Sequence, residues 1–135
     1  MSTKIIKGKD NNGNIYYSDM PVKQITVTLS NTTSGKVYCY QCGRIVFVEI
    51  EDIVFNQDIT TCSSDSTWLF LSFVSGLPRP KFDWQVFRCI PNSNANDPYL
   101  ELGSNGVLQV TMRGQEGKTL PQGKPINASF SYLIA

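Results

Sequence analysis

Histidine is absent from the 135-residue sequence. Its absence removes the commonest general base near neutral pH, the Ser-His and Cys-His nucleophile pairs, and the imidazole ligands of catalytic zinc. The sequence also lacks the G-x-G-x-x-G pattern and the phosphate loop G-x-x-x-x-G-K-S/T, so nucleotide binding has no support. We therefore expect a protein that is not an enzyme and that uses no cofactor.

The sequence has no excess of one charge and no long apolar run. With 12 basic and 11 acidic residues, the net charge is +1, which creates no field that would collect nucleic acid or anionic lipid. No run approaches the roughly 20 apolar residues that span a bilayer. The polar opening MSTKIIKGKDNNGN lacks the apolar centre of a signal peptide. We expect no nucleic-acid partner, no membrane insertion and no signal peptide.

Uninterrupted helical periodicity is missing as well. Short runs of β-branched and aromatic residues recur instead, separated by glycine, proline and asparagine turns. A chain of this length fits one hydrophobic core, and no internal linker divides it. The sequence predicts a single all-β domain over residues 1–135, a sandwich or a barrel, in which residues 1–35 are a candidate N-terminal attachment arm.

The stretch 66–90 organises this prediction. Its first half alternates as a buried strand, a loop rich in glycine and proline follows at 75–81, and Phe82, Trp84 and Val86 then alternate again. This spacing predicts a second strand over 82–90 with Trp84 on its core side. Elsewhere the pattern predicts a strand at 22–29, hairpins that turn at 41–44 and 103–106, and a closing strand at 126–134.

The cysteines are Cys39, Cys42, Cys62 and Cys89. The first two have the spacing with which two thiolates reach one zinc ion. Between the second two lie 26 residues, which breaks the zinc pattern. We expect reduced cysteines, partly in the core, and no metal; zinc and a disulfide are the alternatives.

The densest acidic group is Glu49, Glu51 and Asp52. Two carboxylates can cleave glycosidic bonds without histidine. On a strand, however, Glu49 and Glu51 share one face while their neighbours alternate into the core. This arrangement is typical of a solvated sheet surface, so we expect no catalysis there.

Three stretches together carry a resemblance to a known family. They are the tryptophan-bearing apolar strand that runs into SGLPRP at 75–80, then YLELGSNGVLQV at 99–110, and INASFSYLI at 126–134. With them, residues 36–135 resemble the C-terminal head domain of phage tail-fibre and baseplate receptor-binding proteins from Gram-positive hosts. The chain departs from that family in lacking a long N-terminal shaft before residue 36.

The resemblance implies an antiparallel β-sandwich, jelly-roll or tumour-necrosis-factor-like, that forms a homotrimer. It implies a location in the virion, contact with other virion proteins, and binding of a host cell-surface saccharide or other receptor during host adsorption. A structural capsid or tail decoration protein that binds no glycan is the alternative, followed by a host carbohydrate-binding module.

Saccharide recognition needs aromatic faces beside amide, carboxylate and guanidinium groups, carried on loops by a rigid sheet. Two loops meet this need. The candidate ligand-binding residues are Arg79, Lys81, Trp84, Asn94, Asn96 and Asp97. The loops flank opposite ends of the 82–90 strand, so we expect them to form one pocket only if neighbouring subunits bring them together. Since the alternation places Trp84 in the core, Asp97, Asn96 and Arg79 rank ahead of it.

Overall fold

The computed structural model describes residues 2–9, 11–13, 15–60, 70–91, 98–112 and 118–135, with side chains described for 11–13, 22–60, 71–91, 98–112 and 118–135. The described strands are β1 (Ser2–Lys9), β2 (Ile15–Ile25), β3 (Thr28–Leu29), β4 (Thr33–Cys42), β5 (Ile45–Phe55), β6 (Ile59–Thr60), β7 (Phe70–Ser75), β8 (Gln85–Arg88), β9 (Tyr99–Leu102), β10 (Leu108–Thr111), β11 (Thr119–Leu120) and β12 (Ile126–Leu133).

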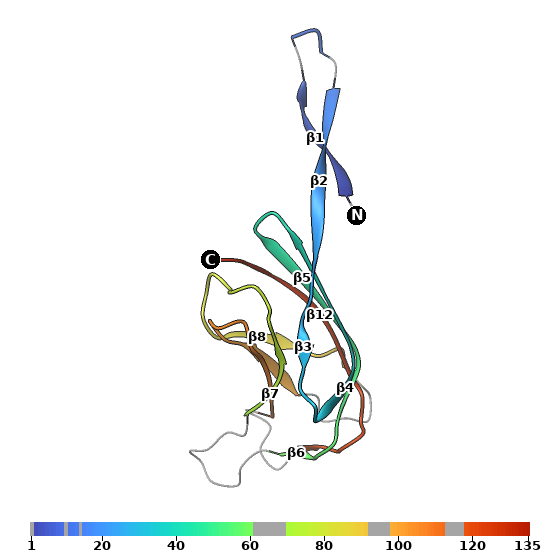
Figure 1. Cartoon of the computed structure of the whole chain (residues 1–135), viewed down its shortest axis with the longest axis vertical. Coiled ribbons are helices and arrows are strands. Elements are labelled where there is room, and N and C mark those ends of the chain that lie inside the picture. Colours follow the sequence, from blue (N-terminus) through green and yellow to red (C-terminus); the bar gives the residue numbers. More distant parts are fainter. Residues whose placement is uncertain (1, 10, 14, 61–69, 92–97, 113–117) are drawn as a thin grey trace.

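The described strands form an antiparallel β-sandwich (Figure 1). The first sheet has the order β1-β2-β4-β5-β12, and the second sheet has the order β3-β7-β10-β9-β8. A short pair of β6 and β11 accompanies them. The predicted all-β sandwich is therefore confirmed.

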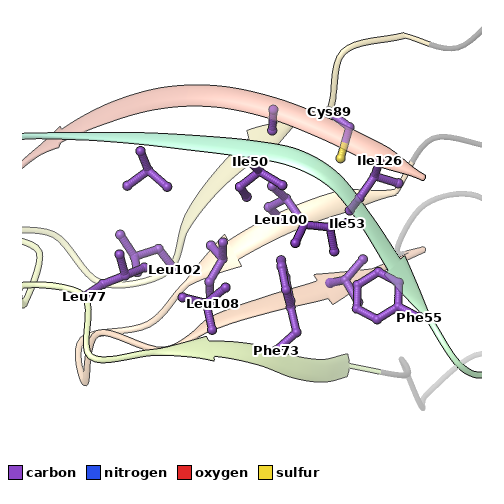
Figure 2. Packing of buried hydrophobic residues seen from close by; sticks show 14 of the residues in the cluster. Ile50, Ile53, Phe55, Phe73, Leu77, Cys89, Leu100, Leu102, Leu108 and Ile126 are labelled. Carbon is purple, nitrogen blue, oxygen red and sulfur yellow. The ribbon is translucent and has the colours of Figure 1, made fainter. Parts of the chain in front are cut away.

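The core lies between the two sheets (Figure 2). Ile50 of the first sheet faces Leu100, Leu108 and Phe73 of the second, and all four are at most 2% exposed. The ring of Phe73 meets that of Phe55 edge to face, with centroids 5.3 Å apart. These contacts hold the second sheet rigidly against the first, so its outer face can carry a site.

The predicted hairpins and closing strand are present. The β4–β5 turn contains Gly43, and the β9–β10 turn contains Asn105 and Gly106. The closing strand is β12, which pairs with β5 along the first sheet. Glycines at positive φ in both turns match the chemistry of tight hairpins.

Two strand predictions were wrong in part. The predicted strand 22–29 divides after Ile25: β2 ends in the first sheet, and β3 begins in the second. The predicted strand 82–90 contains only β8 as regular structure, and Phe82, Trp84 and Val86 are all exposed. The opposite set faces inward, because the ring of Phe87 stacks on that of Phe130 at 4.0 Å. Trp84 is thus a surface residue and not a core residue.

A two-stranded ribbon projects from the sandwich (Figure 1). β1 pairs with β2 from Ser2↔Pro21 to Lys9↔Ile15, whereas β2 pairs with β4 only from Val22 onward. The turn around Gly13 joins the two strands, at a φ of 81°. The sequence indicated this turn, but the polar segment before it did not indicate β1.

None of the three described cysteines, Cys39, Cys42 and Cys89, is joined in a disulfide. Cys39 and Cys42 are three positions apart on β4, and side chains alternate along a strand, so their sulfurs lie on opposite faces of the sheet. Cys39 and Cys89 are buried in the core, whereas Cys42 is half-buried. One ion cannot bind Cys39 and Cys42 together in this arrangement. Cys62 lies outside the described residues.

Alkaline pH is expected to destabilise the fold through Cys39. Burial raises the pKa of this thiol from 9.0 to about 11. The folded state thus favours the neutral thiol, so its stabilising contribution is complete below pH 9 and is lost as the pH rises through 11. Urea unfolding of Cys39→Ala should show a smaller loss of unfolding free energy over this pH range than the parent. Cys42→Ala is the control; if Cys39→Ala and the parent lose equal free energy, Cys39 is not the cause.

Candidate functional site

Trp84 stands at the start of β8 with 60% of its surface exposed. Its backbone has a φ of 56°, a left-handed conformation that is rare for a bulky residue. The edge of the indole lies over Gly103: a Cβ added to Gly103 would lie 3.8 Å from the nearest carbon of the Trp84 ring. The Gln85 side chain fixes the turn by donating to the Phe82 carbonyl at 3.0 Å. The sequence therefore holds a flat aromatic face toward solvent.

Arg79 and Lys81 lie on the loop that precedes Trp84. The backbone of this loop pairs with the end of the chain: the Lys81 N–H donates to the Leu133 carbonyl at 2.8 Å, and the Arg79 carbonyl accepts from the Ala135 N–H at 3.1 Å. The Lys81 ammonium lies 5.5 Å from the centroid of the Phe82 ring. Lys81 and Arg79 are both exposed. The structure thus places Arg79, Lys81 and Trp84 on one short segment of fixed backbone.

Asn94, Asn96 and Asp97 lie outside the described residues. Their loop joins Pro91 to Pro98, beyond the end of β8 that is opposite Trp84. At this end the Arg88 guanidinium lies 5.6 Å from the centroid of the Tyr99 ring. The prediction that these three residues bind a ligand remains untested.

The outer face of the second sheet carries polar side chains. One cross-strand row from β8 to β7 consists of Val86 followed by three polar residues, Glu101, Gln109 and Ser72. The end of this row formed by Gln109 and Ser72 lines a groove of about 350 Å³ over β3, β7 and β10, which is bounded by the turn that contains Asn105. Asn105 also borders Gly103, so the groove and Trp84 adjoin the same turn.

The outer face of the first sheet carries an apolar band, which we define as Tyr40, Cys42, Ile45, Phe47 and Leu133. Register places Cys42, Ile45 and Leu133 in one row and Tyr40 beside Phe47 in the next. Phe47 is 47% exposed, and Ile45 and Leu133 are also exposed. Contiguous exposed apolar side chains mark surfaces that contact another macromolecule.

Glu49, Glu51 and Asp52 are exposed, as expected for a solvated sheet surface. Among the described residues, no group of three or more His, Cys, Asp or Glu side chains is placed to hold a metal ion. No helix in the described chain is long and apolar enough to cross a membrane.

Comparison with known proteins gives one informative likeness. The structure is similar to the solved head domain of the lactococcal phage bIL170, described in connection with a common fold for the receptor-binding domains of lactococcal phages. The TM-score is 0.57 at 12% identity, covering 87% of this chain and 100% of the other. The chain has the fold of a phage receptor-binding head domain. No family model and no curated protein matches the sequence.

This head-domain fold brings together residues that the sequence did not connect. Asn105 and Trp84 both border Gly103 of the β9–β10 turn, and Ser72 meets Gln109 across 37 positions of sequence. One signal was available: Leu108 and Val110 alternate with Gln109, which places Gln109 on the outer face. The pairing partner of β10 could not be read from this alternation.

Proposed function

We propose that this chain is a non-catalytic, virion-associated head domain that binds a host cell-surface saccharide during phage adsorption. The observation that carries the proposal is Trp84, an exposed indole held at positive φ on a fold that it shares with a phage receptor-binding head. A strained, exposed aromatic residue has no role in the core, and such strain concentrates at binding sites.

The proposed site consists of Arg79, Lys81 and Trp84, with Asn94, Asn96 and Asp97 supplied by a neighbouring subunit. The indole would stack on the C–H face of a sugar ring, while the cations and amides would hydrogen-bond to its hydroxyls or to acidic substituents. The exposed Arg79 and Lys81 precede the exposed Trp84 on the same loop, which supports this division of roles.

We propose a homotrimer in which the apolar band lies between subunits. Exposed phenylalanine, isoleucine and leucine side chains on a flat sheet are costly in water, and a closed symmetric assembly removes them from it. Three linked sites would also raise the avidity for a repeating polymer on the cell surface.

The β1–β2 ribbon is our proposed attachment arm within residues 1–35. A two-stranded ribbon is marginally stable in water by itself, and in the described chain β1 pairs only with β2. A neighbouring virion protein, or the ribbons of other subunits, would supply the missing contacts.

The alternative is a decoration protein that contacts virion proteins and binds no glycan. The apolar band favours it, since such a band suits any protein–protein contact. The exposed Trp84 favours the receptor-binding function, because a decoration protein has no need of an aromatic face at the opposite sheet.

Replacing Trp84 with glycine is expected to weaken binding to host cell walls at least tenfold without loss of stability. The variant loses the aromatic anchor, which typically contributes about 2 kcal/mol at a binding site. Glycine also relieves the positive φ of 56°, so the melting temperature should stay equal or rise. Binding is measured by sedimentation of labelled protein with host cell walls, and by competition with phage adsorption.

Phe82→Ala is the matched control, because Phe82 has the same exposed fraction on the same loop but its ring lies beneath Lys81. It should reduce binding less than twofold. Arg79→Gln should reduce binding as well. If Trp84→Gly binds as the parent does, the site lies elsewhere; if the parent binds only virion proteins, the decoration function is correct.

A further inference from the structure

We propose that the groove over β3, β7 and β10 is a second binding site, for an uncharged, hydroxyl-rich saccharide segment. It goes beyond the Trp84 site and consists of other residues. Its volume of about 350 Å³ falls at the lower end of the range of roughly 300–1,000 Å³ for small-molecule sites.

A β-bulge builds the floor of the groove. Leu108 pairs with Val74 and Gln109 pairs with Ser72, which leaves Phe73 as an extra residue in β7. Phe73 and Val74 are both buried as a result, whereas Ser72 and Ser75 on either side are exposed in the groove. The bulge thus places two hydroxyl groups at the surface above a rigid apolar layer.

The polar groups of the groove are held in place before any ligand arrives. The Gln109 amide donates to the Ser72 hydroxyl at 3.3 Å, which leaves the Gln109 oxygen as an acceptor. The Asn105 oxygen accepts from the Val107 N–H at 3.2 Å, which directs the Asn105 amino group outward as a donor. Side chains fixed in this way lose little entropy on binding.

The lining selects for a neutral ligand. None of the described lining residues is ionisable; the polar ones are Thr28, Ser30, Ser72, Ser75, Asn105 and Gln109. A phosphate or carboxylate would lack a cation in the groove. Hydroxyl and amide groups match the hydroxyls of a neutral sugar in both donors and acceptors.

An added peptide strand is the other occupant to consider. The neighbouring edge strand β3 has only two residues, Thr28 and Leu29. The next N–H, that of Ser30, already donates to the Phe73 carbonyl at 3.0 Å. This edge is too short to pair with a peptide over several residues, so the saccharide is favoured.

The test is an NMR titration of the full ¹⁵N-labelled chain. The probes are rhamnose, galactose, glucose and N-acetylglucosamine with their disaccharides, glycerol phosphate as an anion, and a threonine–valine peptide. We expect at least one neutral sugar to shift the amide signals of Ser72, Ser75, Asn105 and Gln109. The double variant Ser72→Ala/Gln109→Ala should weaken that binding roughly tenfold, because two hydrogen bonds are lost.

The matched control is Gln24→Ala/Ser131→Ala, which makes the same changes at exposed positions of the first sheet. It should shift the groove signals as the parent does. The indole N–H signal of Trp84 reports binding at the other proposed site separately, so that failure at the Trp84 site and failure here are distinguishable. The proposal is overturned if no neutral sugar shifts the groove signals, if glycerol phosphate or the peptide alone shifts them, or if the double variant binds as the parent does.

Discussion

Replacing Gly106 with alanine is expected to lower the free energy of unfolding by about 3 kcal/mol. Gly106 has a φ of 77°, and a Cβ added there would overlap the Leu77 carbonyl oxygen. The obstacle is backbone, which cannot rotate away as a flexible side chain would. The Leu77 N–H also donates to the Gly106 carbonyl at 3.2 Å, so the overlap would break a contact that fixes the 75–81 loop.

Gly43→Ala separates the cost of the positive φ from the cost of the overlap with Leu77. Gly43 has a φ of 60° but an added Cβ would meet nothing within 4 Å, so only the backbone cost of about 1 kcal/mol applies. Urea unfolding of both variants gives the comparison. Equal losses in the two variants would mean that the approach of Leu77 contributes nothing to stability.

Turn chemistry made parts of the fold predictable from the sequence. The pair Asn105-Gly106 lies between two alternating runs, and the structure has a hairpin there, because few residues accept positive φ. The same holds at Gly43. Local sequence therefore located the turns, whereas the division of the predicted 22–29 strand between two sheets depends on contacts with β4 and β7 that are distant in sequence.

Alternation alone gave the wrong face for Trp84. Phe82, Trp84 and Val86 alternate with the polar Asp83 and Gln85, so the pattern placed them in the core. In the structure Phe87 takes the inward position, since Phe130 of β12 offers it a stacking partner. The exposed aromatic residues are thus an exception to the rule that the apolar residues of an alternating strand face the core. The exception lies where we propose binding, and such exceptions are expected at functional sites.

The residues of the groove could not be predicted as a site. Ser72, Asn105 and Gln109 are ordinary surface residues in sequence, and only the β7–β10 register brings them together. A bulge of one residue sets this register, and nothing in the run FLSFVS distinguishes a bulge from a regular strand. Sites made by pairing distant strands are therefore read from structure.

Replacing Phe47 with aspartate is expected to convert the proposed homotrimer into monomers. Phe47 lies in the apolar band, between Tyr40 of β4 and Ser131 of β12, and is 47% exposed in one chain. In a trimer that buries the band, the new carboxylate would be a charge without a partner, which costs several kcal/mol in each subunit. The fold should persist, because the side chain points away from the core.

Light scattering after gel filtration measures the mass, which should fall to the 15.1 kDa of one chain, while circular dichroism checks the fold. Val86→Asp is the matched control, since Val86 is an equally apolar side chain, 53% exposed, on the second sheet. It should remain trimeric. If the parent protein has a monomeric mass at micromolar concentration, the proposal of a homotrimer is wrong. A trimer that tolerates Phe47→Asp but dissociates with Val86→Asp would place the subunit contact at β8, and the saccharide site could then not lie open on that edge.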